Sequence, residues 1–136
     1  MNILALDIGE KRTGLAISSS NIIAKPLLSI KHIDISDLIN QLKLVIEENK
    51  IEKIIIGLPI SFSRNENDQQ KLVQKIGDQI SKNLNILVEY FDETLTTKIS
   101  SAKFYDSKAK YDKDSESAVL ILENWLENNV ELRNQN

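Results

Sequence analysis

Apolar and polar residues follow one another along this chain in blocks that predict strands first and then alternating helices and strands. An apolar run from Asn2 to Leu6 stops at Asp7, which is typical of a buried strand. A polar turn bracketed by Gly9 and Gly14 leads into a second apolar run, Leu15–Ile17. Two short apolar runs joined by a tight, glycine-containing connection predict a β-hairpin.

The remaining blocks predict further strands and helices in alternation. The strands are expected at Pro26–Ile30, Lys53–Pro59 and Ile86–Phe91. The helices are expected after a cap at Asp34 or Ser36, after the polar loop Ser61–Asp68, after Thr94, and from about Asp114. This order predicts an α/β fold with a mixed five-stranded sheet covered by helices. With no repeat or linker, we expect one domain over residues 1–136, with a polar tail from about residue 129.

Composition narrows the class of protein. The 136 residues include no cysteine, so disulfides and thiolate metal sites are excluded and a reducing compartment is expected. No stretch has the roughly 20 apolar residues of a membrane span, and the first apolar run is too short for a signal peptide. We therefore expect a soluble, cytoplasmic protein. The formal net charge of -3 counts mildly against a nucleic-acid binder, although basic residues recur locally.

Four acidic residues interrupt apolar structure at strand exits or at a helix entry. Asp7 ends the first strand, Asp92 and Glu93 follow the last strand, and Asp114 opens the final helix. Ligand sites of open α/β sheets gather where strands end, so these carboxylates can converge. Like charges raise one another's pKa, and a hard cation such as Mg²⁺ with oxygen ligands removes that penalty. The pattern therefore favours a divalent-metal site for phosphodiester cleavage.

Simpler interpretations of the same residues remain open. Asp114 is equally well explained as a helix N-cap, and Asp92 or Thr94 as the cap of the helix that follows. The turn from Asp7 to Gly14 also matches the phosphate-binding turn of actin-like and sugar-kinase ATPases. Those enzymes need well over twice this length, which disfavours that alternative. His32 is expected to be a surface residue, and Trp125 a core residue.

Four segments together resemble the YqgF family, RNase H-like proteins described as Holliday-junction resolvases and as pre-16S rRNA nucleases. The segments are Leu6–Ala16, Ile55–Pro59, Phe91–Thr97 and Asp114–Glu123. They occur in the family's order and spacing and span nearly the whole chain. The resemblance implies an RNase H-like fold, with opening antiparallel strands followed by parallel ones.

The resemblance also implies roles for particular residues. Asp7, Glu93 and Asp114 match the family's catalytic acids, which would hold Mg²⁺ or Mn²⁺, and Asp92 is a supporting metal ligand. Lys11 and Arg12 match the basic pair that follows the first aspartate, where contact with a phosphate is expected.

The chain departs from the family at two places. Thr94 stands where the family has arginine, and Ile60–Asn65 replaces an Asn-Met-Asp-Gly-like turn. Three cations are candidates to replace the missing arginine in nucleic-acid binding: Arg64, Lys98 and Lys103. The implied function is a hydrolase, an endonuclease that matures the 5′ end of the small-subunit rRNA precursor, acting on structured RNA as a monomer or homodimer. The alternatives are a resolvase of four-way, branched DNA and a catalytically silent RNA- or ribosome-binding module.

Overall fold

A mixed sheet of five strands forms the centre of the molecule in the computed structural model, which describes residues 1–58, 68–92 and 113–129. The strands are β1 (Ile3–Ile8), β2 (Arg12–Ser18), β3 (Lys25–Lys31), β4 (Lys53–Leu58) and β5 (Leu87–Asp92). The helices are α1 (Ile35–Asn49), α2 (Asp68–Leu84) and α3 (Lys113–Asn128). The helix expected after Thr94 lies outside the described residues.

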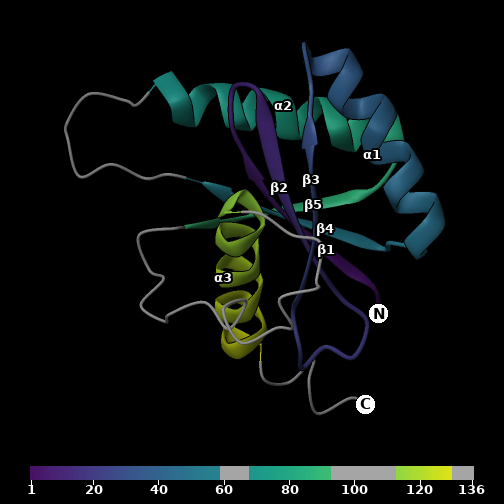
Figure 1. Ribbon diagram of the computed structural model, residues 1–136, viewed down its shortest axis with the longest axis vertical. Coiled ribbons are helices and arrows are strands. Elements are labelled where there is room, and N and C mark those ends of the chain that lie inside the picture. The colour runs from purple at the N-terminus through teal and green to yellow at the C-terminus, as the bar shows by residue number, and fades with distance from the viewer. Residues whose placement is uncertain (59–67, 93–112, 130–136) are drawn as a thin grey trace.

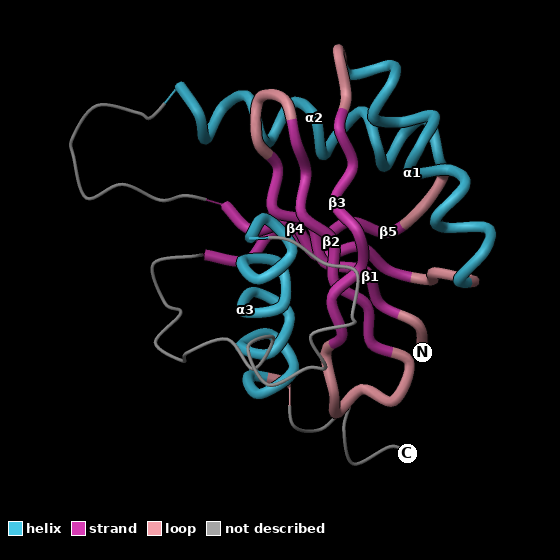
Figure 2. The backbone as a smooth tube through the Cα atoms, viewed as in Figure 1, coloured by secondary structure: helices cyan, strands magenta, loops and turns pink. Residues whose placement is uncertain are grey.

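The sheet has the order β3-β2-β1-β4-β5, with β1 in the middle. β1 pairs antiparallel with β2 and β2 with β3, whereas β1 pairs parallel with β4 and β4 with β5. The predicted mixed sheet, with antiparallel strands first and parallel strands afterwards, is confirmed. Because β1, β4 and β5 are parallel, their carboxyl ends meet at one edge, where the β1–β2 turn and the end of β3 also lie (Figure 2).

Helices cover both faces of the sheet, with α1 and α2 on one side and α3 on the other (Figure 1). Alternate residues of β1 divide between two separate cores, as the period of two in a strand requires. Leu4 and Leu6 belong to the core beneath α1 and α2, while Ile3 and Ala5 belong to the core beneath α3. This division fixes the face to which every later residue of β1 points.

The start of α1 confirms a predicted cap. Asp34 is the N-cap residue, and its Oδ1 accepts a hydrogen bond of 2.8 Å from the backbone N–H of Asp37. Asp37 in turn accepts from the backbone N–H of Ile33 at 3.0 Å. Both carboxylates are therefore engaged in holding the chain between β3 and α1.

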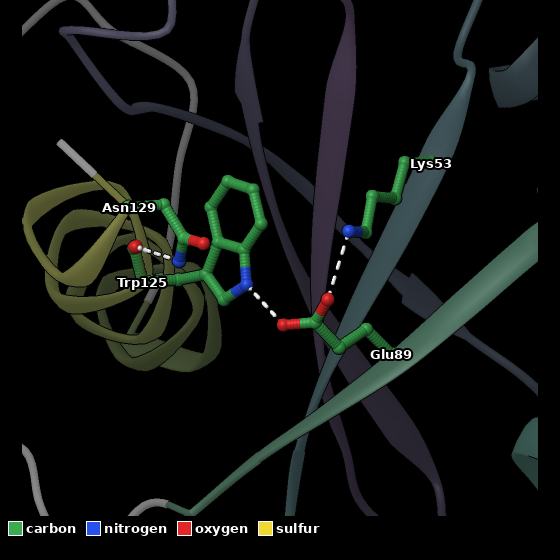
Figure 3. A network of polar contacts seen from close by, with 4 residues as sticks. All are labelled: Lys53, Glu89, Trp125 and Asn129. Atoms are coloured by element: carbon green, nitrogen blue, oxygen red, sulfur yellow. Dashed lines mark hydrogen bonds and ion pairs between the residues drawn. The ribbon is translucent and has the colours of Figure 1, made fainter. Parts of the chain in front are cut away.

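A polar network links α3 to the parallel half of the sheet (Figure 3). The indole of Trp125, which is 2% exposed, donates to the carboxylate of Glu89. The other oxygen of Glu89 forms an ion pair of 2.8 Å with Lys53, whose Nζ lies 5.0 Å from the centre of the indole ring. Trp125 is thus a core residue, as expected, with its one polar atom satisfied. Among the described helices, none is long and apolar enough to cross a membrane.

Candidate functional site

Asp7 is a half-buried carboxylate near the carboxyl end of the central strand. It follows Ile3 and Ala5 at intervals of two, so it points to the α3 side of the sheet. Its direct partner on β2 is Gly14, which faces the same side.

Gly14 lies against the first turn of α3. A β-carbon built on Gly14 would overlap with the backbone carbonyl of Asp114 and would lie 3.0 Å from the backbone nitrogen of Ser115. Only glycine permits so close an approach of helix to strand. Ser115 is fully buried and donates to the carbonyl of Leu27, which also fixes the start of α3 on the sheet.

Asp7 and Asp114 are thereby brought to one place from positions far apart in the sequence. Each neighbours Gly14, Asp7 across the β1–β2 ladder and Asp114 through its own backbone. Asp114 is half-buried and is the second residue of α3, so it lies within the first turn rather than at the cap. Acidic residues in a first helical turn also interact favourably with the helix dipole.

Asp92 reaches the same edge of the sheet but points to the other face. It ends β5 opposite Leu58, and its neighbour Phe91 belongs to the core beneath α3. Tyr90, two residues earlier, donates to the carbonyl of Gln74 on α2 at 3.0 Å. The strand period therefore directs the side chain of Asp92 towards the α1–α2 side.

Several expected site residues lie outside the described part of the chain: Glu93, Arg64, Lys98 and Lys103. Within residues 1–58, 68–92 and 113–129, no group of three histidine, cysteine or acidic residues is arranged to hold a metal ion. Asp7 and Asp114, which both neighbour Gly14, nevertheless have the chemistry to bind a hard divalent cation, because carboxylate oxygens are ligands that Mg²⁺ and Mn²⁺ prefer. A third donor is needed to complete such a set.

The basic pair of the β1–β2 turn lies at the same end of the sheet. Lys11 and Arg12 are both exposed, and the turn is closed by a hydrogen bond of 2.8 Å from the N–H of Gly9 to the carbonyl of Arg12. Two further residues, Lys31 and His32, line a pocket together with this pair. The sequence did not identify either of them as part of a site.

His32 is not the surface residue that the sequence predicted. It is 8% exposed, and its Nε2 lies 3.0 Å from the hydroxyl of the fully buried Thr13. Burial lowers its pKa below the usual value, although Asp37 and Asp34 act in the opposite direction. The sequence contains a weak indication that His32 is buried, because Ile30 and His32 are spaced by two at the end of β3 and share its buried face. The polar residues around His32 outweighed that indication.

Solved structures with the same fold include two resolvases. RuvC of Thermus thermophilus in complex with a Holliday junction substrate superposes with a TM-score of 0.68 at 12% sequence identity, over 96% of each chain. The fowlpox virus resolvase with its Holliday junction DNA gives a TM-score of 0.59 at 13% identity, over 94% of this chain and 98% of that one. The molecule therefore has the RNase H-like fold of the RuvC-type enzymes.

Sequence comparison identifies the family within that class. Residues 1–128 match the model of the RuvX family, described as Holliday junction resolvase. A relative from Dictyoglomus turgidum is 33% identical over 133 residues, 93% of this chain and 94% of its own length. A relative from Rickettsia rickettsii is 34% identical over 131 residues, 92% and 85% of the two chains. Both carry the name "Putative pre-16S rRNA nuclease".

The chain belongs to the RuvX family. The resemblance to YqgF proteins found in the four sequence segments is thereby confirmed. Members of this family are phosphodiester-cleaving nucleases and hence hydrolases, which agrees with the reaction class inferred from the acidic residues.

Proposed function

We propose that this protein is a cytoplasmic, metal-dependent endonuclease that processes the 5′ end of the small-subunit rRNA precursor. The convergence of Asp7 and Asp114 at Gly14 carries the proposal. Both residues are half-buried, and both neighbour Gly14, so a divalent cation bound between them would offset their like charges. The names of the relatives favour precursor rRNA as the substrate.

Asp7, Asp114 and Glu93 are the proposed ligands of Mg²⁺ or Mn²⁺. When bound, the metal would supply Lewis-acid stabilisation of the charge that develops on the scissile phosphate. Asp7 would hold its place through the ladder of the central strand, and Asp114 through the contact of α3 with Gly14. Asp92 faces the other side of the sheet and is assigned a supporting role at the same edge.

The basic residues would bind the backbone of the nucleic acid. Lys11 and Arg12 are exposed beside the acidic pair and are proposed to contact phosphates near the scissile bond. Arg64, Lys98 and Lys103 are proposed, from the sequence, to supply the positive charge that Thr94 does not. We propose that the enzyme acts as a monomer or a homodimer.

Cleavage of four-way DNA junctions is the second candidate, favoured by the description of the RuvX family and by the RuvC-type fold. A catalytically silent RNA- or ribosome-binding module is the third, favoured by Thr94 in place of the family's arginine. These candidates differ in substrate or in turnover, so one set of reactions separates them.

The test compares wild type with Asp7→Asn and with Glu47→Gln, which removes the same charge from the exposed face of α1. Each protein is incubated with Mg²⁺ or Mn²⁺ and either a 5′-extended rRNA precursor or a synthetic four-way junction. We expect wild type and Glu47→Gln to cut the RNA and Asp7→Asn to leave it intact while remaining folded. Cutting of the junction alone would assign a resolvase, and metal-independent RNA binding without cutting would assign the silent module.

A second measurement tests metal binding without turnover. A ligand that binds only the folded state raises its melting temperature in proportion to the logarithm of ligand concentration. Mg²⁺ or Mn²⁺ should therefore raise the melting temperature of wild type and Glu47→Gln more than that of Asp7→Asn. Equal rises in all three proteins would remove Asp7 from the ligand set.

A further inference from the structure

Three basic side chains gather at the edge of the sheet beside the acidic pair. Lys11, Arg12 and Lys31, together with His32 and Ile33, line a pocket of about 450 Å³. That volume falls in the range of about 300–1,000 Å³ that is usual for ligand sites. The two lysines and the arginine come from both sides of the β2–β3 ladder.

Arg12 and Lys31 are direct cross-strand partners. Side chains at such positions have β-carbons about 4.5–5.5 Å apart, and like charges there destabilise a sheet. Among the described residues, no carboxylate forms an ion pair with Lys11, Arg12 or Lys31. A repulsive pair that has no ion-pair partner in the described part of the chain is a feature that an external anion would stabilise.

Two acidic residues near the pocket are engaged in hydrogen bonds at the start of α1. Asp34 accepts the backbone N–H of Asp37, and Asp37 accepts the backbone N–H of Ile33 at 3.0 Å and the side-chain amide of Gln41 at 3.1 Å. Glu10, in the turn itself, is exposed. Among the described residues, neither these two carboxylates nor Glu10 forms an ion pair with the three cations of the pocket.

The base of the pocket is held rigidly by buried polar contacts. The imidazole of His32 bonds to the hydroxyl of Thr13, and the backbone N–H of His32 donates to the carbonyl of Lys11 at 3.0 Å. These contacts tie the β1–β2 turn to the end of β3. The cations at the rim are thus presented from a fixed backbone, which lowers the entropy lost when an anion binds.

The pocket has a definite relation to the acidic pair. Arg12 precedes Gly14 by two residues on β2, so both face the α3 side, about 7 Å apart along the strand. Phosphates of one nucleic-acid strand advance by about 3.4 Å per nucleotide along a duplex axis. A strand whose scissile phosphate lies at Asp7 and Asp114 would therefore carry another phosphate past Arg12 within about two nucleotides.

We infer that Arg12 and Lys31 together bind a non-scissile backbone phosphate of the substrate strand, with Lys31 as the residue that completes the site. The inference rests on the proposed nuclease function for the identity of the ligand. It assigns to Lys31 a role in positioning the strand for cleavage, and it predicts a contact that does not depend on base sequence.

The test measures equilibrium binding in EDTA, so that no cleavage occurs, of a 5′-extended rRNA precursor and of a four-way DNA junction. Lys31→Gln is compared with Lys82→Gln, because Lys82 is exposed in the last turn of α2, at the opposite end of the sheet. Loss of one phosphate contact should lower the slope of log affinity against log salt by about one. We expect this change, and roughly five- to tenfold weaker binding, for Lys31→Gln, and values close to wild type for Lys82→Gln.

A second variant, Lys31→Glu, separates a loss of binding from a loss of folding. Its carboxylate would face Arg12 and replace repulsion by attraction, so the melting temperature should be unchanged or raised while binding falls further. Identical salt slopes for wild type, Lys31→Gln and Lys82→Gln would overturn the inference, as would the absence of binding by wild type.

The two proposals fail separately. If wild type binds either nucleic acid with the predicted Lys31 dependence but does not cleave with Mg²⁺ or Mn²⁺, the phosphate site stands and the nuclease assignment falls. If cleavage depends on Asp7 but binding is indifferent to Lys31, the nuclease assignment stands and the phosphate site falls.

Discussion

The α-carbon of Gly14 faces the backbone carbonyl of Asp114 so closely that any side chain at position 14 would overlap with it. This contact sets the distance between α3 and the sheet at the point where Asp7 lies. The geometry of the candidate site therefore depends on a residue that has no side chain.

Gly14→Ala should damage activity more than stability. The added methyl would push α3 outwards at a cost of about 1–3 kcal/mol. A displacement of about 1 Å at a catalytic group can cost about 100-fold in rate, so we expect at least that loss of RNA cleavage. Cleavage rate and urea unfolding, measured on the same preparations, provide the test.

The matched control is Ile17→Val, which removes one methyl group from the same strand on the α1–α2 side, at a cost of about 0.5–1.5 kcal/mol. It should retain nearly full activity. If both variants lost activity in proportion to stability, the contact between Gly14 and Asp114 would have no specific role in the site.

Asp114→Asn and Asp92→Asn should have unequal effects on cleavage. Asp114 shares its face of the sheet with Asp7, whereas Asp92 points towards α2. Removal of a direct metal ligand should lower kcat/KM by more than about 100-fold, while loss of a supporting residue should lower it by about 10- to 100-fold. The metal concentration at half-maximal activity should rise for Asp114→Asn. An equal loss in Asp92→Asn, with its melting temperature preserved, would place Asp92 among the ligands.

The strands and the mixed character of the sheet could be predicted because each strand carries a local signal. The central strand β4 is buried on both faces from Ile54 to Leu58, and that stretch is therefore apolar. The cap at Asp34 and the core position of Trp125 were predicted for the same reason, since a cap and an apolar helix face are properties of adjacent residues.

The close contacts of the site could not be predicted from the residues alone. The convergence of Asp7 and Asp114 was expected, but the contact that produces it, the docking of α3 on Gly14, joins residues 100 positions apart and has no local signal. His32 was wrongly expected at the surface because its partner, Thr13, lies 19 residues away. A role for Lys31 could not be predicted, because it depends on the pairing of Lys31 with Arg12. That pairing is set by the β2–β3 register, which is irregular between Thr13 and Leu15.

The burial of His32 predicts a pH dependence of stability. The pKa of His32 in the folded protein is lowered from the usual 6.5, chiefly by burial. As the pH falls, its imidazole therefore takes up a proton in the unfolded chain before it does so in the native protein. The contribution of His32 to the free energy of unfolding is therefore fully present above pH 6.5. It decreases as the pH falls below 6.5 towards the folded-state pKa. The unfolding free energy of wild type should decrease more steeply than that of His32→Gln over this window.

Urea unfolding at a series of pH values measures this difference directly. Carboxylates also titrate as the pH falls, but they are common to both proteins and cancel in the comparison. Parallel curves for wild type and His32→Gln would show that His32 has the same pKa in the folded and unfolded states.

The network of Glu89, Trp125 and Lys53 predicts a difference between two substitutions at one position. The pKa of Glu89 is lowered: burial raises it, but hydrogen bonds from Lys53 and Trp125 and the charge of Lys53 outweigh that effect. Glu89→Gln retains an oxygen that can accept from the indole and loses only a partly exposed ion pair, which is worth about 1 kcal/mol or less. Glu89→Ala leaves the buried indole N–H without its acceptor, at a cost of about 1–3 kcal/mol.

Unfolding by urea at neutral pH should therefore rank the proteins as wild type, Glu89→Gln and Glu89→Ala in decreasing stability, with the larger step between the two variants. Because the lowered pKa of Glu89 stabilises the native state only above the usual value of 4.5, the advantage of wild type over Glu89→Gln should shrink as the pH falls below 4.5. Equal stability of the two variants at neutral pH would mean that water replaces the carboxylate at the indole. The contact between α3 and β5 would then rest on apolar packing alone.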